Sequence, residues 1–370
     1  LYLATFIISS SLLMVEIVST RVSKIAFGYN FQFVILSFAL VGLGIGGIII
    51  FFKWEKIHKE LNKNLLIISL IYVIFLVIPF LITHFVDIFP NILVKILFFT
   101  SSFLVYTLAG IILASIFREY SKDISQIYAV SFIGSAFGAL TTVLLLQTFG
   151  TQISILFILL FSSIAILAFS YLSRSYLKIS LFVVLSIFLV VIPFQNLSAS
   201  SLTIKCDQRE ILLSDSNSFS QIDAFQINPK ILAKEASLNY NWQSLSTEAD
   251  MYRMYIDCIG ITSAIEYNKS KNIEFITFDI SNFPFMVRNY TSALIVGSGA
   301  GIDVVRADFS GVKNTTGVEI NPIIVELTDK LVDPKENVYY KDNVNLVISE
   351  ARSFIADSNN EYDLIYLSSS

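Results

Sequence analysis

The first 195 residues consist mainly of long apolar runs that carry almost no charge. A helix needs about 20 apolar residues to cross a bilayer, and seven runs approach or reach that length: residues 1–20, 31–52, 64–86, 96–117, 126–149, 152–173 and 177–194. Over the whole chain 55% of residues are apolar and 15% are charged, a composition typical of membrane proteins. The sequence therefore predicts a multi-pass helical membrane domain of about seven helices over residues 1–195, with a lipid bilayer as its partner.

One acidic residue, Glu16, lies inside these runs. A carboxylate at that depth is costly unless it is paired or faces a wet cavity. Arg21 lies five residues further on and can reach toward the interface. Two interpretations stay open, a structural ion pair and a functional membrane-embedded acid.

Small residues within the runs have the spacing of helix contacts. Gly42 and Gly46, like Gly134 and Gly138, are four residues apart, which lets membrane helices approach closely. Residues 42–47 also match the glycine pattern of dinucleotide sites, but no strand precedes them, so we interpret them as helix packing. Between the fifth and sixth runs, Gly150 begins the one plausible turn, which predicts a tight helical hairpin.

Charges return at ordinary density beyond the apolar half. Residues 200–290 show alternating strand patterns near 220–228 and 252–256, and we interpret them as a small β-rich subdomain. The net charge of −4 and the absence of a basic stripe argue against a nucleic-acid partner. Cys206 and Cys258 have neither metal-ligand nor CxxC spacing, so we expect unpaired cysteines and no metal site.

The stretch TSALIVGSGAGIDVVRADFSGVKNTTGVEIN, residues 291–321, has the pattern strand, glycine turn, helix, strand. An apolar strand over 293–296 leads into three alternating glycines, and a second strand ends at Glu319, about 20 residues beyond them. Nucleoside and dinucleotide folds place the acid that binds the ribose hydroxyls at this distance. The alternative is a tight strand–helix turn that binds nothing.

Strands and helices continue to alternate after Glu319. Asn321-Pro322 is typical of a helix N-terminus, and we expect a strand at 344–348, a helix at 350–356 and a strand at 363–367. This order predicts an α/β doubly wound parallel sheet, of which residues 291–370 form the first half. The chain is expected to be part of a longer protein.

At several motifs the chain resembles the spermidine synthase branch of the S-adenosylmethionine-dependent transferases, and more closely a bacterial form fused behind a multi-span membrane domain. The motifs are VEIVSTRVSKIAFG (15–28), QIYAVSFIGSAFGAL (126–140), NSFSQID (217–223), YIDCIGIT (255–262), ALIVGSGAGIDV (293–304), TGVEINP (316–322), SEARSFI (349–355) and EYDLIYLSSS (361–370). The resemblance implies a Rossmann-like, class I methyltransferase fold that uses S-adenosylmethionine or decarboxylated S-adenosylmethionine, with an amine or another nucleophile as acceptor.

The resemblance also implies roles for individual residues. Those expected to bind the cofactor are Gly297, Ser298, Gly299, Gly301, Asp303, Glu319 and Glu350. Within this set, Glu319 would hold the ribose hydroxyls and Glu350 would lie near the adenine amino group. Those expected to line the substrate site are Asp257, Thr262 and Ser368.

The chain departs from the family at the catalytic positions. Ala300 stands where spermidine synthases have an aspartate for the cofactor's amino group, and Ser368 stands where an aspartate accepts the acceptor's proton. The family's Tyr-His pair is not recognisable in residues 265–282, and the catalytic residues are left unassigned. Because a serine without a partner is a poor general base, we expect the chain not to be an efficient spermidine synthase.

Three functions stay open. The first is a membrane-anchored transferase of aminopropyl or methyl type. The second is a transporter or sensor whose soluble domain binds a nucleoside or polyamine without turnover. The third is a structural membrane protein with a vestigial domain. A second copy of the chain, in a homodimer, is a further expected partner.

Loop charges and the expected cofactor disagree about the orientation in the cell membrane. Basic residues gather after the second, fourth and sixth runs: Lys53, Lys56, Lys59, Lys63, Arg118, Lys122, Arg174 and Lys178. The positive-inside rule puts these connections in the cytoplasm, so that a seventh crossing would carry the soluble part outside. Nucleoside cofactors are cytosolic, and on that ground we expect the soluble part in the cytoplasm.

Overall fold

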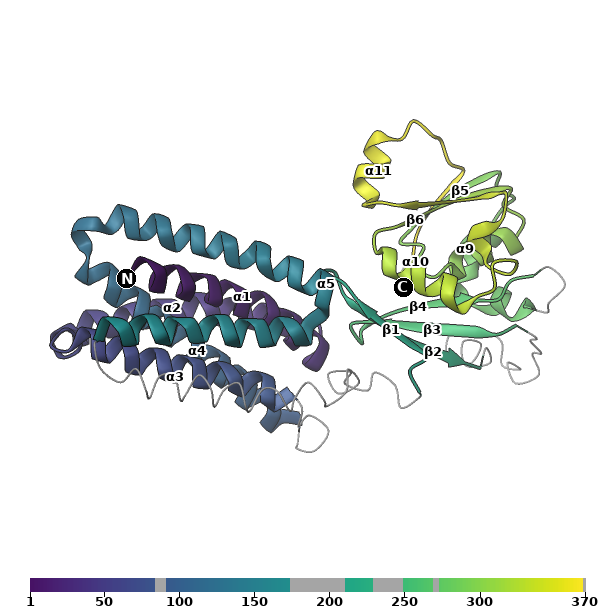
Figure 1. The fold of residues 1–370 in the computed structure, drawn as a ribbon. Helices are drawn as coiled ribbons and strands as arrows, with labels where there is room; N and C mark the ends of the chain where they lie inside the picture. The colour runs from purple at the N-terminus through teal and green to yellow at the C-terminus, as the bar shows by residue number, and fades with distance from the viewer. Residues whose placement is uncertain (84–90, 174–209, 229–248, 269–272, 369–370) are drawn as a thin grey trace. The chain divides into compact units, whose positions relative to one another are not determined.

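The structure is a computed structural model that describes residues 1–83, 91–173, 210–228, 249–268 and 273–368 (Figure 1). The chain divides into two compact units, Leu1–Cys206 and Asp207–Ser370. The first is helical and the second contains two β-sheets. The β-rich region and the α/β region of the sequence thus belong to one compact unit.

The helical unit contains α1 (Tyr2–Phe27), α2 (Phe31–His58), α3 (Leu61–Thr83), α4 (Asn91–Glu119) and α5 (Ile124–Ser173). Gly150 interrupts α5 with a backbone φ of 74°, so the described residues provide six helices long and apolar enough to span a membrane. The first six predicted spans and the hairpin at Gly150 are confirmed as such helices. The seventh predicted run, 177–194, lies outside the described residues.

Glycines sit where the helices touch. A Cβ at Gly46 would lie 2.6 Å from the backbone of Gly110 on α4, and a Cβ at Gly138 would lie 2.3 Å from the carbonyl oxygen of Ser10 on α1. By contrast, a Cβ at Gly44 would meet nothing within 4 Å. The helix-packing interpretation of Gly46 and Gly138 is therefore confirmed.

Buried hydroxyl groups join α1 to α5 and to α3. Ser10 Oγ donates to the carbonyl oxygen of Gly134 at 2.7 Å, and Ser11 Oγ and Tyr72 Oη lie 3.0 Å apart. Glu16 is half-buried on α1. Both interpretations of Glu16, a structural ion pair and a functional membrane-embedded acid, stay predictions.

The first sheet of the second unit is antiparallel. Its strands are β1 (Leu213–Ser216), β2 (Gln221–Ile227), β3 (Met251–Ile256) and β4 (Gly260–Ile265), in that order across the sheet. The strands predicted at 220–228 and 252–256 are confirmed as β2 and β3. The sequence analysis did not predict β1 and β4, which complete the sheet on either side.

The turn between β3 and β4 corrects one expectation. Asp257 and Cys258 adopt positive φ values of 50° and 60° in this turn. Cys258 is disulfide-bonded, so the prediction of unpaired cysteines is wrong for this residue. The chain's other cysteine, Cys206, lies outside the described residues.

The second sheet is parallel, with strand order β7-β6-β5-β8. Along the chain its elements are β5 (Ser292–Val296), α9 (Ile302–Phe309), β6 (Asn314–Glu319), α10 (Pro322–Leu331), β7 (Val344–Ile348), α11 (Ala351–Asp357) and β8 (Leu364–Leu367). These elements confirm the predicted strands and helices, with small differences at their ends. Short helices surround them: η4 (Glu274–Phe278), η5 (Ile280–Asn282) and α8 (Phe283–Met286) before β5, and η6 (Val338–Tyr340) before β7.

The antiparallel sheet shares a hydrophobic core with the glycine turn and α10. Ala300, 3% exposed, packs in one cluster with Ile222 of β2, Met254 of β3 and Ile324 of α10. The antiparallel sheet therefore lies over the turn between β5 and α9. This packing positions the candidate site described next.

Candidate functional site

The turn between β5 and α9 depends on its glycines. Gly297, Gly299 and Gly301 have φ values of 73°, 57° and 98°, a region that side chains with a Cβ rarely adopt. At Gly299 space is also lacking, because a Cβ there would lie 2.2 Å from Thr262 Oγ1. The turn thus needs glycine both for its conformation and for the close approach of β4.

Glu319 lies at the carboxyl end of β6 and binds the glycine turn directly. Its Oε2 accepts a hydrogen bond from the backbone N–H of Gly299 at 2.9 Å, and its Oε1 accepts one from Asn321 at 2.8 Å. The side chain is buried, with 5% of its surface exposed. A carboxylate oxygen has two acceptor positions, so each oxygen keeps capacity for a further donor such as a ribose hydroxyl.

Thr262 and Asp257, both predicted to line the substrate site, have different surroundings. Thr262 Oγ1 accepts a hydrogen bond from the backbone N–H of Ala300 at 2.9 Å, which attaches β4 to the glycine turn. Asp257 Oδ1 accepts one from the backbone N–H of Gln221 at 2.9 Å, where β2 meets the β3–β4 turn. The structure therefore brings Thr262 to the glycine turn and gives Asp257 a contact within the antiparallel sheet.

Tyr339 supports the turn from η6 and was not predicted from the sequence. Its hydroxyl lies 3.0 Å from Ser298 Oγ and donates to the carbonyl oxygen of Gly299 at 2.8 Å. Burial raises the pKa of Tyr339, which keeps the hydroxyl protonated. Asn337 caps η6 by accepting a hydrogen bond from the Tyr339 backbone N–H at 3.0 Å. An asparagine is a common helix N-cap, so Asn337 was the sequence feature that could have predicted η6.

Ser368 lies at the point where the strand order reverses. The first strand of the parallel sheet, β5, pairs with β6 on one side and with β8 on the other. Ligands of open parallel sheets bind outside the carboxyl ends of two such strands. Ser368 follows β8 at this edge, its backbone N–H donates to the Val296 carbonyl oxygen at 2.9 Å, and its Oγ donates to Asp303 Oδ2 at 2.5 Å.

Asp303 belongs to a buried charged cluster. Arg306 binds the carboxylates of both Asp303 and Asp279, and the three residues are between 3% and 5% exposed. Two carboxylates and one guanidinium give the cluster a net charge of −1. Asp303, expected to bind the cofactor, is thus placed between Ser368 and Arg306. Asp279 and Arg306 are 27 residues apart in sequence, and no local motif joins them.

Glu350 has a local structural role in this structure. It is the N-cap of α11, where its carboxylate accepts hydrogen bonds from the backbone N–H and hydroxyl of Ser353 at 2.9 and 3.2 Å. The Ser353 backbone bond and the other local donors lower the pKa of Glu350 to about 2. The predicted contact with adenine stays a prediction.

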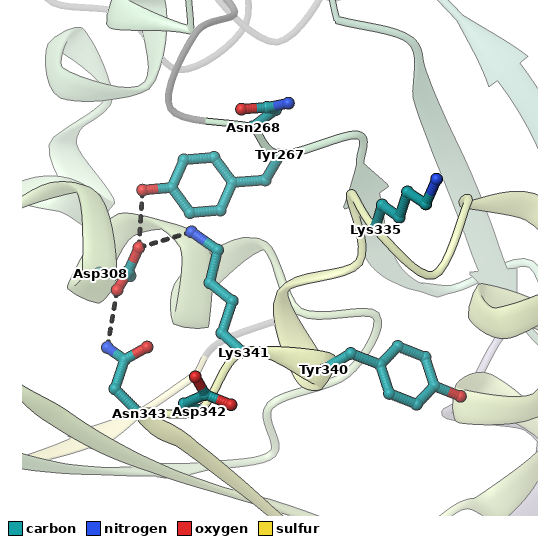
Figure 2. Close-up of a pocket in the computed structure, with 8 residues that line it drawn as sticks. All are labelled: Tyr267, Asn268, Asp308, Lys335, Tyr340, Lys341, Asp342 and Asn343. Carbon is teal, nitrogen blue, oxygen red and sulfur yellow. Dashed lines mark hydrogen bonds and ion pairs between the residues drawn. The ribbon is translucent and has the colours of Figure 1, made fainter.

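A cavity of about 480 Å³ lies at the other edge of the parallel sheet (Figure 2). It is lined by Tyr267, Asn268, Asp308, Lys335, Tyr340, Lys341, Asp342 and Asn343. Asn343 precedes β7, so this is the amino edge of the sheet, and none of the predicted site residues lines the cavity.

A hydrogen-bonded cluster around Asp308 forms one wall of this cavity. Asp308 Oδ2 accepts from Tyr267 at 2.7 Å and from Lys341 at 2.9 Å, and its Oδ1 accepts from Asn343 at 2.7 Å (Figure 2). Burial alone would raise the pKa of Asp308, but these three hydrogen bonds outweigh it and leave the pKa below its usual range. The cluster is internally satisfied, and we interpret it as a structural support.

Comparisons with known proteins give little guidance. No family model matches the chain, and no curated protein matches it. Among solved structures, the chain is similar to the crystal structure of spermidine synthase in complex with the transition state analogue AdoDATO. The match covers 43% of this chain and 47% of that one, with 16% identity and a TM-score of 0.27. The chain thus spans about half the length of that structure, and a likeness this weak carries no argument.

Proposed function

We propose that the second unit binds the nucleoside of S-adenosylmethionine or decarboxylated S-adenosylmethionine at the carboxyl ends of β5 and β6. The contact between Glu319 and the Gly299 backbone carries this proposal. It places a buried carboxylate against a glycine turn, next to strands of order β7-β6-β5-β8. This is the arrangement that a Rossmann-like, class I methyltransferase domain uses for the ribose of its ligand.

The activity that fits this site best is transfer of an aminopropyl or methyl group to an amine or another nucleophile. The bound sulfonium would supply the reactivity. The chain would hold and orient the ligand. Glu319 would bind the ribose hydroxyls, and the glycine turn would let the backbone approach the ligand closely. Orientation of two reactants is itself a large contribution to rate. The helical unit, with six described helices able to span a membrane, would anchor the transferase to the bilayer.

A second function is favoured by one observation in the turn itself. Ala300 is buried in the hydrophobic core, so the turn presents no acid at the position where spermidine synthases hold the cofactor's amino group. A sensor or transporter that binds a nucleoside or polyamine without turnover does not need that acid. In this function Glu16, the acid within α1, would be the working group of the membrane unit.

Product analysis distinguishes the two functions. The full chain in detergent is incubated with S-adenosylmethionine or its decarboxylated form and with putrescine, spermidine or other amines. Mass spectrometry then measures S-adenosylhomocysteine and methylthioadenosine, the thioether products of transfer. Release that depends on both the acceptor and the protein supports the transferase. Binding of the nucleoside without either product supports the sensor or transporter.

A further inference from the structure

Ser368, at the end of β8, forms a hydrogen bond with the carboxylate of Asp303, which lies 65 residues away in the sequence. Ser368 is half-buried, whereas Asp303 is 3% exposed. Their hydrogen bond of 2.5 Å runs from the serine hydroxyl to Asp303 Oδ2. A ligand at the carboxyl edge can therefore reach the Ser368 hydroxyl, while Asp303 is reached through that hydroxyl.

Asp303 is held in place on its other side. Arg306 binds Asp303 through the remaining oxygen, Oδ1, and uses its second terminal nitrogen to bind Asp279. Because Arg306 is shared between two carboxylates, its positive charge does not neutralise the pair. One negative charge stays buried behind Ser368, and a negative charge at this place favours a proton arriving from the ligand side.

Two tyrosines are close enough for the cluster's charge to act on them. They are Tyr366 of β8 and Tyr339 of η6, and the charge of Asp303 acts on both. Burial raises the pKa of each tyrosine, so both stay neutral near pH 7. Arg306 of α9 binds Asp303 directly and binds Asp279, at the start of η5, with its other terminal nitrogen. The charges of Glu319 and Asp329 also act on Tyr339.

We propose that Ser368 and Asp303 act as a proton-accepting pair for the nucleophile, an inference that rests on the proposed transferase function. Attack by an acceptor nitrogen forms a nitrogen–carbon bond, breaks the carbon–sulfur bond of the sulfonium and leaves the electron pair on sulfur. The nitrogen gives its proton to Ser368 Oγ, and the Ser368 hydroxyl proton moves to Asp303 Oδ2. Ser368 touches the nucleophile, and Asp303 is a positioning and proton-storing residue behind it.

The experiment compares substitutions in the full chain in detergent. Ser368→Ala removes the hydroxyl, Ser368→Thr keeps it, and Ser368→Asp supplies a carboxylate directly. Ser310→Ala is the matched control, because its hydroxyl hydrogen bond, 3.3 Å to Asn282, lies at the other end of α9. Each variant is measured for nucleoside affinity by calorimetry and for thioether product formation with an amine acceptor.

We expect Ser368→Ala to lower kcat by about 10²- to 10⁴-fold, the usual effect of losing a general base. The nucleoside Kd should change by less than about threefold, because the hydroxyl acts in proton transfer. Ser368→Thr, Ser368→Asp and Ser310→Ala should keep turnover within about tenfold of the original chain. Added imidazole should restore part of the Ser368→Ala rate, which a purely structural role of the hydroxyl does not predict.

The other outcomes contradict either the Ser368–Asp303 pair or the proposed function. Unchanged kcat in Ser368→Ala overturns the pair, as does a loss of kcat that imidazole and Ser368→Thr fail to recover. A chain that binds the nucleoside but transfers to no acceptor overturns the pair and leaves nucleoside binding standing. A chain that binds no sulfonium nucleoside removes the proposed function, and the pair with it.

Discussion

Glu319 Oε2 accepts a hydrogen bond of 2.9 Å from the backbone N–H of Gly299. This contact joins the end of β6 to the glycine turn that follows β5, across 20 residues of sequence. The acid expected to bind a ribose thus also fixes the conformation of the turn beside it. A change at either residue should therefore affect both the fold of the turn and its affinity for a nucleoside.

Gly299→Ala should destabilise the second unit by more than a matched glycine substitution. Both Gly299 and Gly311 have positive φ values, 57° and 89°, and an alanine in such a conformation costs about 1–3 kcal/mol. Only at Gly299 does the new Cβ meet a neighbour, Thr262 Oγ1, at 2.2 Å. Chemical unfolding of the full chain in detergent measures the two free energies. An equal loss for Gly299→Ala and Gly311→Ala would show that the Thr262 contact is not a constraint.

Gly138→Leu should separate α1 from α5, the helix that carries Gly138. A side chain there enters the backbone of α1 at Ser10, whereas Gly44→Leu points into open space. Helices that approach through small residues lose packing over several turns when one is enlarged. The thermal unfolding midpoint in detergent should fall for Gly138→Leu and change little for Gly44→Leu. The reverse order would mean that the two glycines have been assigned to the wrong surfaces.

The Asp308 cluster should make stability depend on pH at the acidic end. The folded-state pKa of Asp308 is lowered, so its contribution is fully present above the unfolded value of about 3.9 and is lost as pH falls through the lower folded value. Asp308→Asn should reduce the unfolding midpoint at neutral pH and flatten its decline between about pH 5 and pH 2. The control is Asp342→Asn, at an exposed acid of the same cavity. Identical pH curves for the original chain and Asp308→Asn would contradict this account.

Thiol labelling in intact cells tests the orientation. Loop charges put the end of α2 and its connection to α3 in the cytoplasm. Lys56→Cys, in the last turn of α2, should therefore resist a membrane-impermeant reagent in a chain without other cysteines. The proposed cofactor is cytosolic, so Glu326→Cys, exposed on α10, should resist it too. Labelling of Lys56→Cys from outside would overturn the loop-charge assignment.

The oxidation state of Cys258 gives a second test of orientation. Disulfides persist in oxidising compartments and are rare in the cytosol, so a Cys258 disulfide that persists in cells would indicate that the second unit lies outside the membrane. A cytoplasmic second unit predicts a Cys258 thiol that is free when cells are quenched with an alkylating reagent. A Cys258 blocked as the disulfide, together with external labelling of Glu326→Cys, would contradict the proposed cofactor.

Sequence patterns predicted those elements of the second unit that are stabilised by residues close to them in the chain. Asn321 before Pro322 predicted the start of α10, where Asn321 Oδ1 accepts from the Ile323 backbone N–H at 3.3 Å. The strands β1 (Leu213–Ser216) and β4 (Gly260–Ile265) carry no comparable signal, because pairing with β2 and β3 stabilises them.

The candidate site shows the same division. The glycines and Glu319 follow from spacing along the chain, but the charged cluster behind Ser368 does not. Arg306 joins Asp303, three residues away, to Asp279, 27 residues away, and the second contact forms only when η5 packs against α9. The sequence argument against efficient spermidine synthesis treated Ser368 as a serine without a partner. Asp303 supplies one, so that argument now depends on Ala300.

Calorimetric titration of the full chain in detergent tests the central claim, nucleoside binding at Glu319. The account predicts saturable binding of S-adenosylmethionine, its decarboxylated form or methylthioadenosine. Glu319→Ala should weaken it by about 1.5–3 kcal/mol, the range for a hydrogen bond to a charged group, or roughly 10- to 150-fold in Kd. Glu326→Ala, which removes an exposed acid from α10, should leave Kd unchanged. No binding of any of the three nucleosides, or equal affinity with and without Glu319, would contradict the account.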